Sequence, residues 1–171
     1  MMKITPGGDV STYSSGATGE PFKTPNYPAF DLEGNLFVCD SGDWKADNGR
    51  IFKISPGGET QVWDRRQKEF PNGLCLGPDG SSLYIAMSVN PPRVNWVSIN
   101  SDGSAGSTET FIELPKTVPD GVAFDTDNNL YVSMYRPDVI YRVSPSRQAE
   151  ILAEDPEGTL IEARFGPQTE E

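Results

Sequence analysis

The sequence predicts an all-β fold, a β-propeller of four-stranded antiparallel blades, with about three and a half blades present, or half of a six-bladed ring. A pattern that starts with Pro-Asn or Pro-Asp and ends in an aromatic strand occurs three times. Its marker residues Asn26, Asn72 and Asp120 stand 46 and 48 positions apart, close to the ~40 to 50 residues of a propeller blade. Helical periodicity is absent, and short alternating runs between Gly- and Pro-containing turns take its place.

The repeat divides the chain into parts of one partial propeller domain, residues 1–171. The expected parts are the end of a blade at 1–14, blades at 25–63, 71–112 and 119–153, and an irregular tail at 154–171. The first part is assigned to the end of a blade because Lys3 to Asp9 matches Lys53 to Glu59, which lies late in its own repeat. Since propellers close with ~4 to 8 blades, we expect either that two copies form a homodimer that completes the ring, or that the isolated chain exposes apolar blade faces and aggregates.

Each blade is expected to hold four strands separated by turn residues. The expected strands of the first blade are 28–31, 35–39, 50–55 and 60–63; those of the second are 73–77, 82–87, 93–99 and 108–112; those of the third are 121–125, 129–134, 138–144 and 149–153. The second strand of each blade carries an aromatic residue, namely Phe37, Tyr84 and Tyr131. Because the aromatic residue recurs in the same strand, it is interpreted as a packing position between blades and not as part of a ligand site.

The composition limits the partners and the catalytic groups that can be expected. The 14 Lys and Arg residues are outnumbered by 25 Asp and Glu residues, which gives a net charge of −11, so nucleic acid and anionic membranes are not expected as partners. The chain has no histidine, which excludes a Ser-His-Asp triad and imidazole metal ligands. No apolar run approaches the ~18 residues of a membrane span, and the start lacks the apolar core of a signal peptide. A cytoplasmic location is expected, although a signal peptide could precede a chain that begins within a repeat.

The two cysteines, Cys39 and Cys75, lie inside apolar runs. Neither shows the spacing of a zinc site, so small buried side chains are a better interpretation than a disulfide or a metal site.

The repeated residues also resemble a known family. The stretches Pro71-Asn72-Gly73-Leu74, Pro78 to Tyr84 and Pro119 to Val132 are similar to those of the SMP-30/gluconolactonase/LRE-like family. The resemblance covers roughly residues 22 to 160. It implies a six-bladed propeller with one divalent cation in its central channel, and hydrolysis of a lactone or a related ester as the small-molecule substrate.

The same resemblance implies roles for individual residues. Asn72 corresponds to a metal ligand, Asp120 to both a ligand and the catalytic proton acceptor that activates water, and Asn26 to a residue that orients the substrate. The family also implies a glutamate ligand from the opening blade, and no glutamate stands at the corresponding place in residues 1–24. Thr24 occupies the position where some members carry an arginine for sugar-acid substrates, so a sugar-lactone preference is not supported.

Geometry gives an independent reason to group these residues. In a propeller, side chains at the start of each innermost strand point at the axis, so Asn26, Asn72 and Asp120 are expected at one site. Amide and carboxylate oxygens are hard ligands that suit Ca²⁺, the expected cation, with Mg²⁺, Mn²⁺ and Zn²⁺ as alternatives. A metal-dependent lactonase-type hydrolase is the function that these features favour.

Plainer interpretations remain open. Asn72-Gly73 and Asp120-Gly121 are also ordinary turn dipeptides. The run from Asp125 to Asn129 resembles the opening of a calcium loop but lacks the later Gly and Glu, and a hairpin turn is preferred. Asp43 and Trp44 belong either to the channel mouth or to an exposed loop without a role. The alternatives to an enzyme are a non-catalytic propeller that binds a partner on its face, and an inactive truncated fragment.

Overall fold

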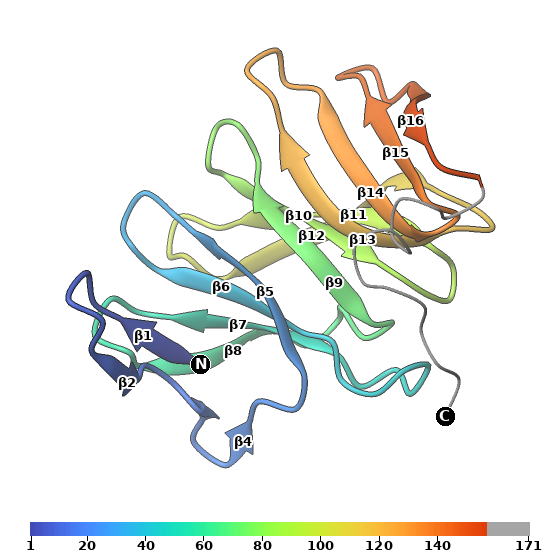
Figure 1. The fold of residues 1–171 in the computed structure, drawn as a ribbon. Helices are drawn as coiled ribbons and strands as arrows, with labels where there is room; N and C mark the ends of the chain where they lie inside the picture. The colour runs from blue at the N-terminus through green and yellow to red at the C-terminus, as the bar shows by residue number, and fades with distance from the viewer. Residues whose placement is uncertain (157–171) are drawn as a thin grey trace.

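The structure, a computed structural model, describes residues 1–156 and consists there of β-strands joined by turns and loops. Three four-stranded antiparallel sheets follow one another along the chain (Figure 1). The first sheet contains β5 (Pro25–Phe30), β6 (Leu36–Asp40), β7 (Arg50–Ile54) and β8 (Thr60–Asp64). The second contains β9 (Pro71–Leu76), β10 (Ser82–Met87), β11 (Arg93–Ile99) and β12 (Ala105–Glu113). The third contains β13 (Val118–Phe124), β14 (Leu130–Arg136), β15 (Val139–Val143) and β16 (Ala149–Glu154).

Two short pairs of strands precede the first sheet. Strands β1 (Met2–Ile4) and β2 (Val10–Thr12) form a two-stranded sheet within the segment assigned to the end of a blade. Strands β3 (Gly16–Ala17) and β4 (Glu20–Pro21) form a second pair, which the sequence did not predict because two-residue strands show no alternation. Residues 157–171, most of the predicted irregular tail, lie outside the described residues.

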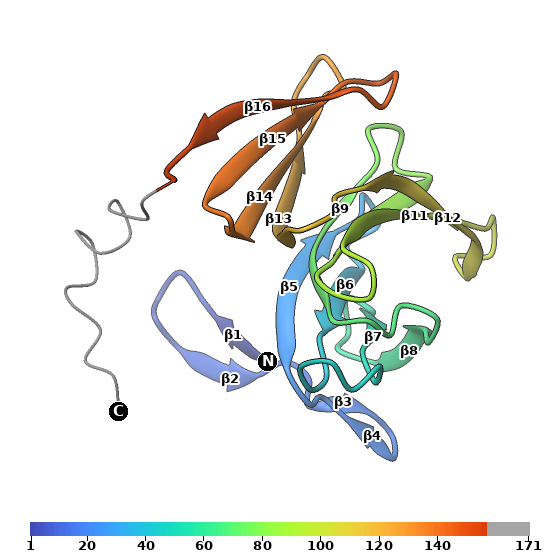
Figure 2. The same cartoon turned by 90° about the vertical axis from the view of Figure 1, so that its right-hand side faces the viewer.

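The all-β propeller fold is confirmed, and the three sheets lie side by side like blades (Figure 2). Each sheet begins with its inner strand, and β5, β9 and β13 lie next to one another in that order. These inner strands begin earlier than the predicted starts at 28, 73 and 121, because each includes the Pro-Asn or Pro-Asp pair that was placed before it. Strand β12 is likewise longer than its predicted range, 108–112.

The three sheets share one pairing register. Pro25 pairs with Asp40, Pro71 with Met87, and Pro119 with Met134. The register then shifts in all three sheets, between Pro25 and Pro28, between Pro71 and Leu74, and between Pro119 and Val122. Each inner strand therefore carries a β-bulge at the same point, which sequence periodicity alone could not indicate.

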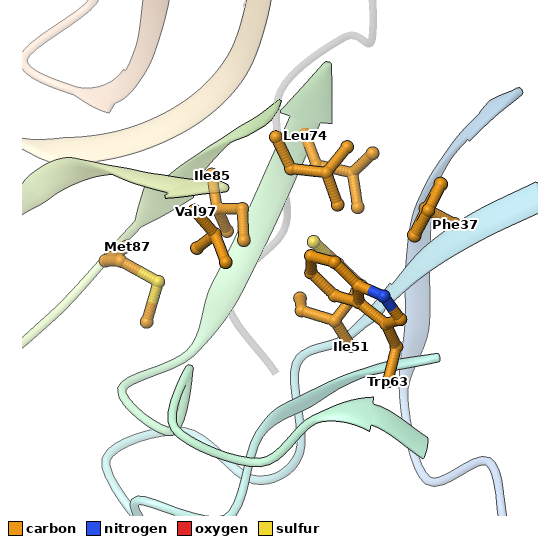
Figure 3. Packing of buried hydrophobic residues seen from close by; sticks show 9 residues of the cluster. Phe37, Ile51, Trp63, Leu74, Ile85, Met87 and Val97 are labelled. Carbon is orange, nitrogen blue, oxygen red and sulfur yellow. The ribbon is translucent and has the colours of Figure 1, made fainter. Parts of the chain in front are cut away.

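The faces of adjacent sheets that lie opposite one another are packed together. Between the first and second sheets the core contains Phe37, Cys39, Ile51, Trp63, Leu74, Leu83, Ile85, Met87 and Val97 (Figure 3). Phe37 meets Trp63 edge to face, with ring centroids 5.1 Å apart. Between the second and third sheets, Ala86 and Val94 pack against Val122, Leu130, Val132, Met134, Val139 and Val143. Burial of these side chains at ~25 cal/mol per Å² of apolar surface holds the sheets together.

Residues near the N-terminus cover the face of the first sheet that points away from the second sheet. Leu36, Val38, Phe52 and Ile54 are buried there against Met1, Tyr13, Ala17 and Phe22. Strands β1 to β4 therefore belong to the same folded body as the first sheet.

The run from Asp125 to Asn129 is a hairpin turn, as preferred over a calcium loop. The Asp125 carboxylate accepts hydrogen bonds from the backbone of Asp127, from Asn129 and from the Tyr131 hydroxyl. These bonds engage its oxygens within the turn and lower the pKa of Asp125, the Asn129 side chain making the largest contribution.

Both cysteines are free thiols inside the sheets. Burial raises the pKa of Cys39 well above its usual value and raises that of Cys75 to about 12. The expectation of a small buried side chain is confirmed for Cys39, whereas Cys75 is only partly buried. Among residues 1–156 there is no long apolar helix of the kind that crosses a bilayer.

Candidate functional site

The three repeated polar residues occupy equivalent places in the three sheets. Asn26 and Asn72 are the second residues of β5 and β9, and Asp120 is the third residue of β13. Each directly follows the proline that pairs before the bulge, so all three lie within a bulge. A bulge turns a side chain away from the regular alternation of its strand, which is a common arrangement beside functional sites.

Asn26 and Asn72 are in direct contact across the first two sheets. The Asn26 side-chain Nδ2 donates a hydrogen bond of 2.6 Å to Oδ1 of Asn72. Asn26 is exposed, whereas Asn72 is only 9% exposed. The structure therefore brings together two of the three predicted site residues, with the more buried one in the middle sheet.

The backbone of Asp120 lies against Gly73, the residue that follows Asn72. A Cβ atom on Gly73 would stand 2.3 Å from the carbonyl oxygen of Asp120 and 2.8 Å from Cα of Gly121. Only glycine allows β9 and β13 to approach this closely, so the residue next to Asn72 sets the distance to the strand of Asp120. Gly73 is thus explained by strand contact, and the turn interpretation of Asn72-Gly73 and Asp120-Gly121 is wrong, because both pairs lie inside strands.

The Asp120 side chain is open to solvent. Within residues 1–156 its carboxylate accepts no hydrogen bond and forms no ion pair. The following residue, Gly121, is held by a 3.0 Å hydrogen bond from its backbone N–H to Ser133 Oγ. A fixed backbone with an unengaged carboxylate leaves Asp120 able to bind a ligand or accept a proton.

Two serines that the sequence analysis missed hold the asparagines. Ser41 and Ser88 follow the second strands of the first and second sheets and are almost fully buried. Asn26 Nδ2 lies 3.3 Å from Ser41 Oγ, and Asn72 Nδ2 lies 3.4 Å from Ser88 Oγ. Their only sequence signal was recurrence 47 residues apart, which is weak for so common a residue.

Each serine also reaches the next sheet. Ser41 Oγ donates a 2.8 Å hydrogen bond to the carbonyl oxygen of Pro71, and Ser88 Oγ donates a 2.7 Å hydrogen bond to that of Pro119. These carbonyls directly precede Asn72 and Asp120. The three candidate residues are therefore linked from sheet to sheet by a series of side-chain and carbonyl hydrogen bonds.

The oxygens that these neighbouring strands carry are of the type that a hard cation prefers, but their total charge is low. No group of three or more Asp, Glu or Cys side chains that could hold a metal occurs among the described residues. The local donors are amide oxygens of Asn26 and Asn72 and the carboxylate of Asp120, which fit Ca²⁺ chemically but supply one negative charge. Glu20 does not supply a second, because its carboxylate is bound by Arg50 and Arg65.

The strand that carries Asn26 is fixed by a buried carboxylate. Asp40, 1% exposed, accepts hydrogen bonds from the backbone N–H groups of Lys23 and Thr24 and from the Arg50 side chain. Thr24 is thus held through its backbone, directly before Pro25. Asp40 contributes to this site by fixing the chain, and its oxygens are not available to a ligand.

The loop after β6 contains Asp43 and Trp44. Trp44 is 51% exposed and packs edge to face on Phe70, with centroids 4.8 Å apart. Phe70 directly precedes Pro71 and Asn72, so this aromatic pair lies near the start of β9. Asp43 forms an ion pair with Lys23 and hydrogen bonds with Asn48. This carboxylate is therefore occupied within the loop.

Comparison with known proteins gives a match over nearly the whole chain. The SMP-30/Gluconolactonase/LRE-like region matches residues 3–164. A gluconolactonase from Zymomonas mobilis subsp. mobilis is 28% identical over 168 residues, which cover 86% of this chain and 46% of the relative. The Arabidopsis thaliana protein named strictosidine synthase-like 3 is 28% identical over 149 residues, or 79% of this chain and 37% of the relative. The chain spans less than half the length of these curated relatives.

Solved structures support the fold. The calcium-binding protein regucalcin from Agrobacterium tumefaciens superposes with a TM-score of 0.69 at 19% identity, over 84% of this chain and 49% of that protein. At this identity the likeness concerns the arrangement of the sheets.

Proposed function

Because this chain belongs to the SMP-30/gluconolactonase/LRE-like family, we propose that it is a lactonase-type hydrolase that uses a divalent cation. The observation that carries the proposal is the close approach of the backbones that carry Asn72 and Asp120 on adjoining inner strands, which Gly73 permits. The names of the relatives add the substrate class, since one of them is a gluconolactonase. The structural neighbour regucalcin is named as a calcium-binding protein, and Ca²⁺ is accordingly the first cation to test.

The residues of this chain have distinct tasks in the proposal. Asn72 Oδ1 and the Asp120 carboxylate hold the cation, which supplies electrophilic polarisation of the ester carbonyl when bound. Asp120 has a second task, which is to take a proton from the attacking water at a carboxylate oxygen. Asn26, exposed and already hydrogen-bonded to Asn72, orients the substrate through its remaining amide oxygen. The substrate class is a lactone or related ester.

The low charge of the donor set has a consequence for affinity. One carboxylate with amide oxygens binds a dication weakly, so we expect Ca²⁺ affinity in the weak part of the protein range, about 10⁻⁴ to 10⁻³ M. A further carboxylate, such as the glutamate that the family resemblance implies, would strengthen it. Thr24 offers no positive charge for a sugar acid, so simple lactones belong in the substrate panel beside gluconolactone.

The proposal is tested by Asp120→Asn, with Asp127→Asn as the matched control. Asp127 is an exposed aspartate in the β13–β14 turn, so its substitution removes the same charge away from the inner strands. Lactone hydrolysis is measured with Ca²⁺ in excess, and Ca²⁺ binding is measured by calorimetry. We expect Asp120→Asn to lower hydrolysis by about 100-fold or more and to weaken Ca²⁺ binding, and Asp127→Asn to change neither.

The main alternative is a non-catalytic propeller that binds a ligand on its face. It predicts no lactone hydrolysis by the wild-type chain and ligand binding that survives Asp120→Ala. Wild-type activity lost equally in Asp120→Asn and Asp127→Asn would also contradict the assigned role of Asp120.

A further inference from the structure

Ser88 stands at the junction between the two residues to which the proposed function assigns the cation. Ser88 is 1% exposed, and its hydroxyl lies between the Asn72 amide and the carbonyl of Pro119. Pro119 directly precedes Asp120. One hydroxyl therefore contacts both the side chain of one proposed ligand and the backbone next to the other.

Hydrogen-bond counting fixes the direction of these contacts. A serine hydroxyl has one hydrogen to donate, and Ser88 Oγ directs it to the Pro119 carbonyl at 2.7 Å, since that oxygen can only accept. Toward Asn72, Ser88 must then act as an acceptor, so the NH₂ end of the amide faces Ser88. The carbonyl end, Oδ1, is consequently turned toward Asn26, whose Nδ2 it meets at 2.6 Å.

The direction matters because the two ends of an asparagine amide differ toward a cation. Oδ1 is a hard oxygen ligand, whereas the NH₂ group carries positive partial charge and repels a cation. A flipped Asn72 would present the wrong end to the site at almost no steric cost. We propose that Ser88 is a positioning residue that selects the amide orientation of Asn72, in which Oδ1 accepts the hydrogen bond from Asn26 and keeps its second lone pair for a cation. This inference rests on the proposed cation-dependent function.

The first sheet shows the same arrangement and supports a dedicated role. Ser41 Oγ donates to the Pro71 carbonyl at 2.8 Å and lies 3.3 Å from Asn26 Nδ2. The amide of Asn26 is therefore oriented in the same way as that of Asn72. In the third sheet, Pro119 pairs with Met134. The next residue, which corresponds to Ser41 and Ser88, is Tyr135, and it is 60% exposed. The serine thus occurs where the inner strand carries an asparagine, and is missing where it carries an aspartate, whose two oxygens need no orientation.

The test is Ser88→Ala in the full chain, with Ca²⁺ alone as the probe and calorimetry as the measurement. Removal of a group that orients a metal ligand lowers metal affinity by about 10-fold to 100-fold, and we expect a loss of that size. Ser88→Thr, which keeps the hydroxyl, should restore most of the affinity. Ser82→Ala is the matched control, because Ser82 is a buried serine at the other end of β10, and it should bind Ca²⁺ as the wild type does.

A purely structural role is separated by repeating the substitution in an Asn72→Asp background. A carboxylate has no N–H to direct, so Ser88→Ala should change Ca²⁺ affinity much less there than in the wild type. An equal loss in both backgrounds, or an unchanged affinity of Ser88→Ala in the wild-type background, would overturn the inference.

A second measurement keeps the inference independent of the proposed function. If the wild type binds no Ca²⁺ at millimolar concentrations, the proposed function is wrong for this chain, and the orientation is then read by NMR from the Asn72 side-chain amide without metal. Proton exchange of that amide should be faster in Ser88→Ala than in the wild type, Ser88→Thr or Ser82→Ala. Unchanged exchange in Ser88→Ala would overturn the inference in that case.

Discussion

Asp64 is a buried carboxylate at the end of β8, where the chain leaves the first sheet. It is 4% exposed and accepts hydrogen bonds from the backbone and guanidinium of Arg66 and from the Gln67 amide. Gln67 is fully buried and accepts a hydrogen bond from Asn95 of the second sheet. This one carboxylate therefore holds the connection between two blades in place.

Protonation of Asp64 should reduce stability. Burial raises the pKa of Asp64, but the hydrogen bonds from Arg66 and Gln67 lower it by more, and the net result is a pKa below its usual value. A lowered pKa in the folded state means that the stabilisation is present above the unfolded pKa, about 4, and is lost as the pH falls through the folded value. We expect Asp64→Asn to lower the free energy of unfolding at pH 7 by about 1 to 3 kcal/mol.

Urea unfolding from pH 7 down to pH 3 checks this expectation. The difference between wild type and Asp64→Asn should shrink once the pH falls below about 4, whereas Asp127→Asn, at an exposed position, should follow the wild type closely. A difference between wild type and Asp64→Asn that stays constant over the whole range would contradict the assignment to this carboxylate.

Single residues also show what the sequence could and could not indicate at the site. Asn26, Asn72 and Asp120 were found because they recur in one pattern, and the structure places them at one register position. Their chemical roles stay predictions. Ser41 and Ser88 were missed because each takes part through a hydroxyl that meets the next sheet, and the contact between sheets cannot be read from a strand pattern.

The inner strands carry the geometry that brings the site residues together. In β9 the bulge and Gly73 act at the same point, since a side chain there would collide with the Asp120 carbonyl at 2.3 Å. The second and third sheets can approach at this level only because Gly73 has no Cβ. The element is thus shaped for contact with β13 as well as for pairing with β10.

Gly73→Ala should therefore force β9 and β13 apart. We expect a loss of about 1 to 3 kcal/mol in the free energy of unfolding, the usual cost of adding a methyl group to a packed region, together with weaker Ca²⁺ binding because Asn72 and Asp120 separate. Gly57→Ala is the control, since its added Cβ would meet only the Ser55 side chain at 3.8 Å. Urea unfolding and calorimetry of both variants provide the measurements; equal behaviour of the two would contradict the steric argument.

Strand positions were predictable from turns and alternation, and strand starts were not. The turns contain Gly, Asp and Asn at the residues that close the hairpins, so the outer strands fall near their expected ranges. The inner strands begin two to three residues earlier, at Pro25, Pro71 and Val118. A bulge interrupts alternation at these points, so the pattern of period two ends although the strand continues.

On the scale of the whole molecule, the third sheet differs from the other two in what covers it. Ser133 pairs with Ile140 on the face away from the second sheet, as Cys39 pairs with Ile51 and Ala86 with Val94. The latter four residues are fully buried, whereas Ile140 is 39% exposed. In β16, Ala153 pairs with Ile140, and the bulge residue next to it, Leu152, is more than half exposed. Ile151 pairs with Tyr141 and lies on the other face. The third sheet thus leaves open the face that the first two sheets bury, and this face carries the exposed Ile140 beside the Arg142–Glu150 ion pair.

We expect the chain by itself to associate through this face, and two half-rings forming a dimer are the assembly that the repeat predicts. Light scattering measures the mass of the wild type and of the double variant Ile140→Lys with Leu152→Lys. The wild type should be a dimer or larger, and the double variant should be mostly monomeric. Leu32→Lys is the control, because Leu32 is fully exposed in the β5–β6 turn. A monomeric wild type would contradict the expectation.

The hydrogen bond from a serine hydroxyl to the proline carbonyl of the next sheet has a consequence for how such a chain can grow. It occurs at both junctions between four-stranded sheets, with the same two residue types and nearly the same length. A segment that runs from such a proline to such a serine supplies the acceptor for the preceding sheet and the donor for the following sheet. Tandem duplication of that segment would join new copies to old ones through contacts that already exist, so ring size can change in evolution without the invention of a new interface.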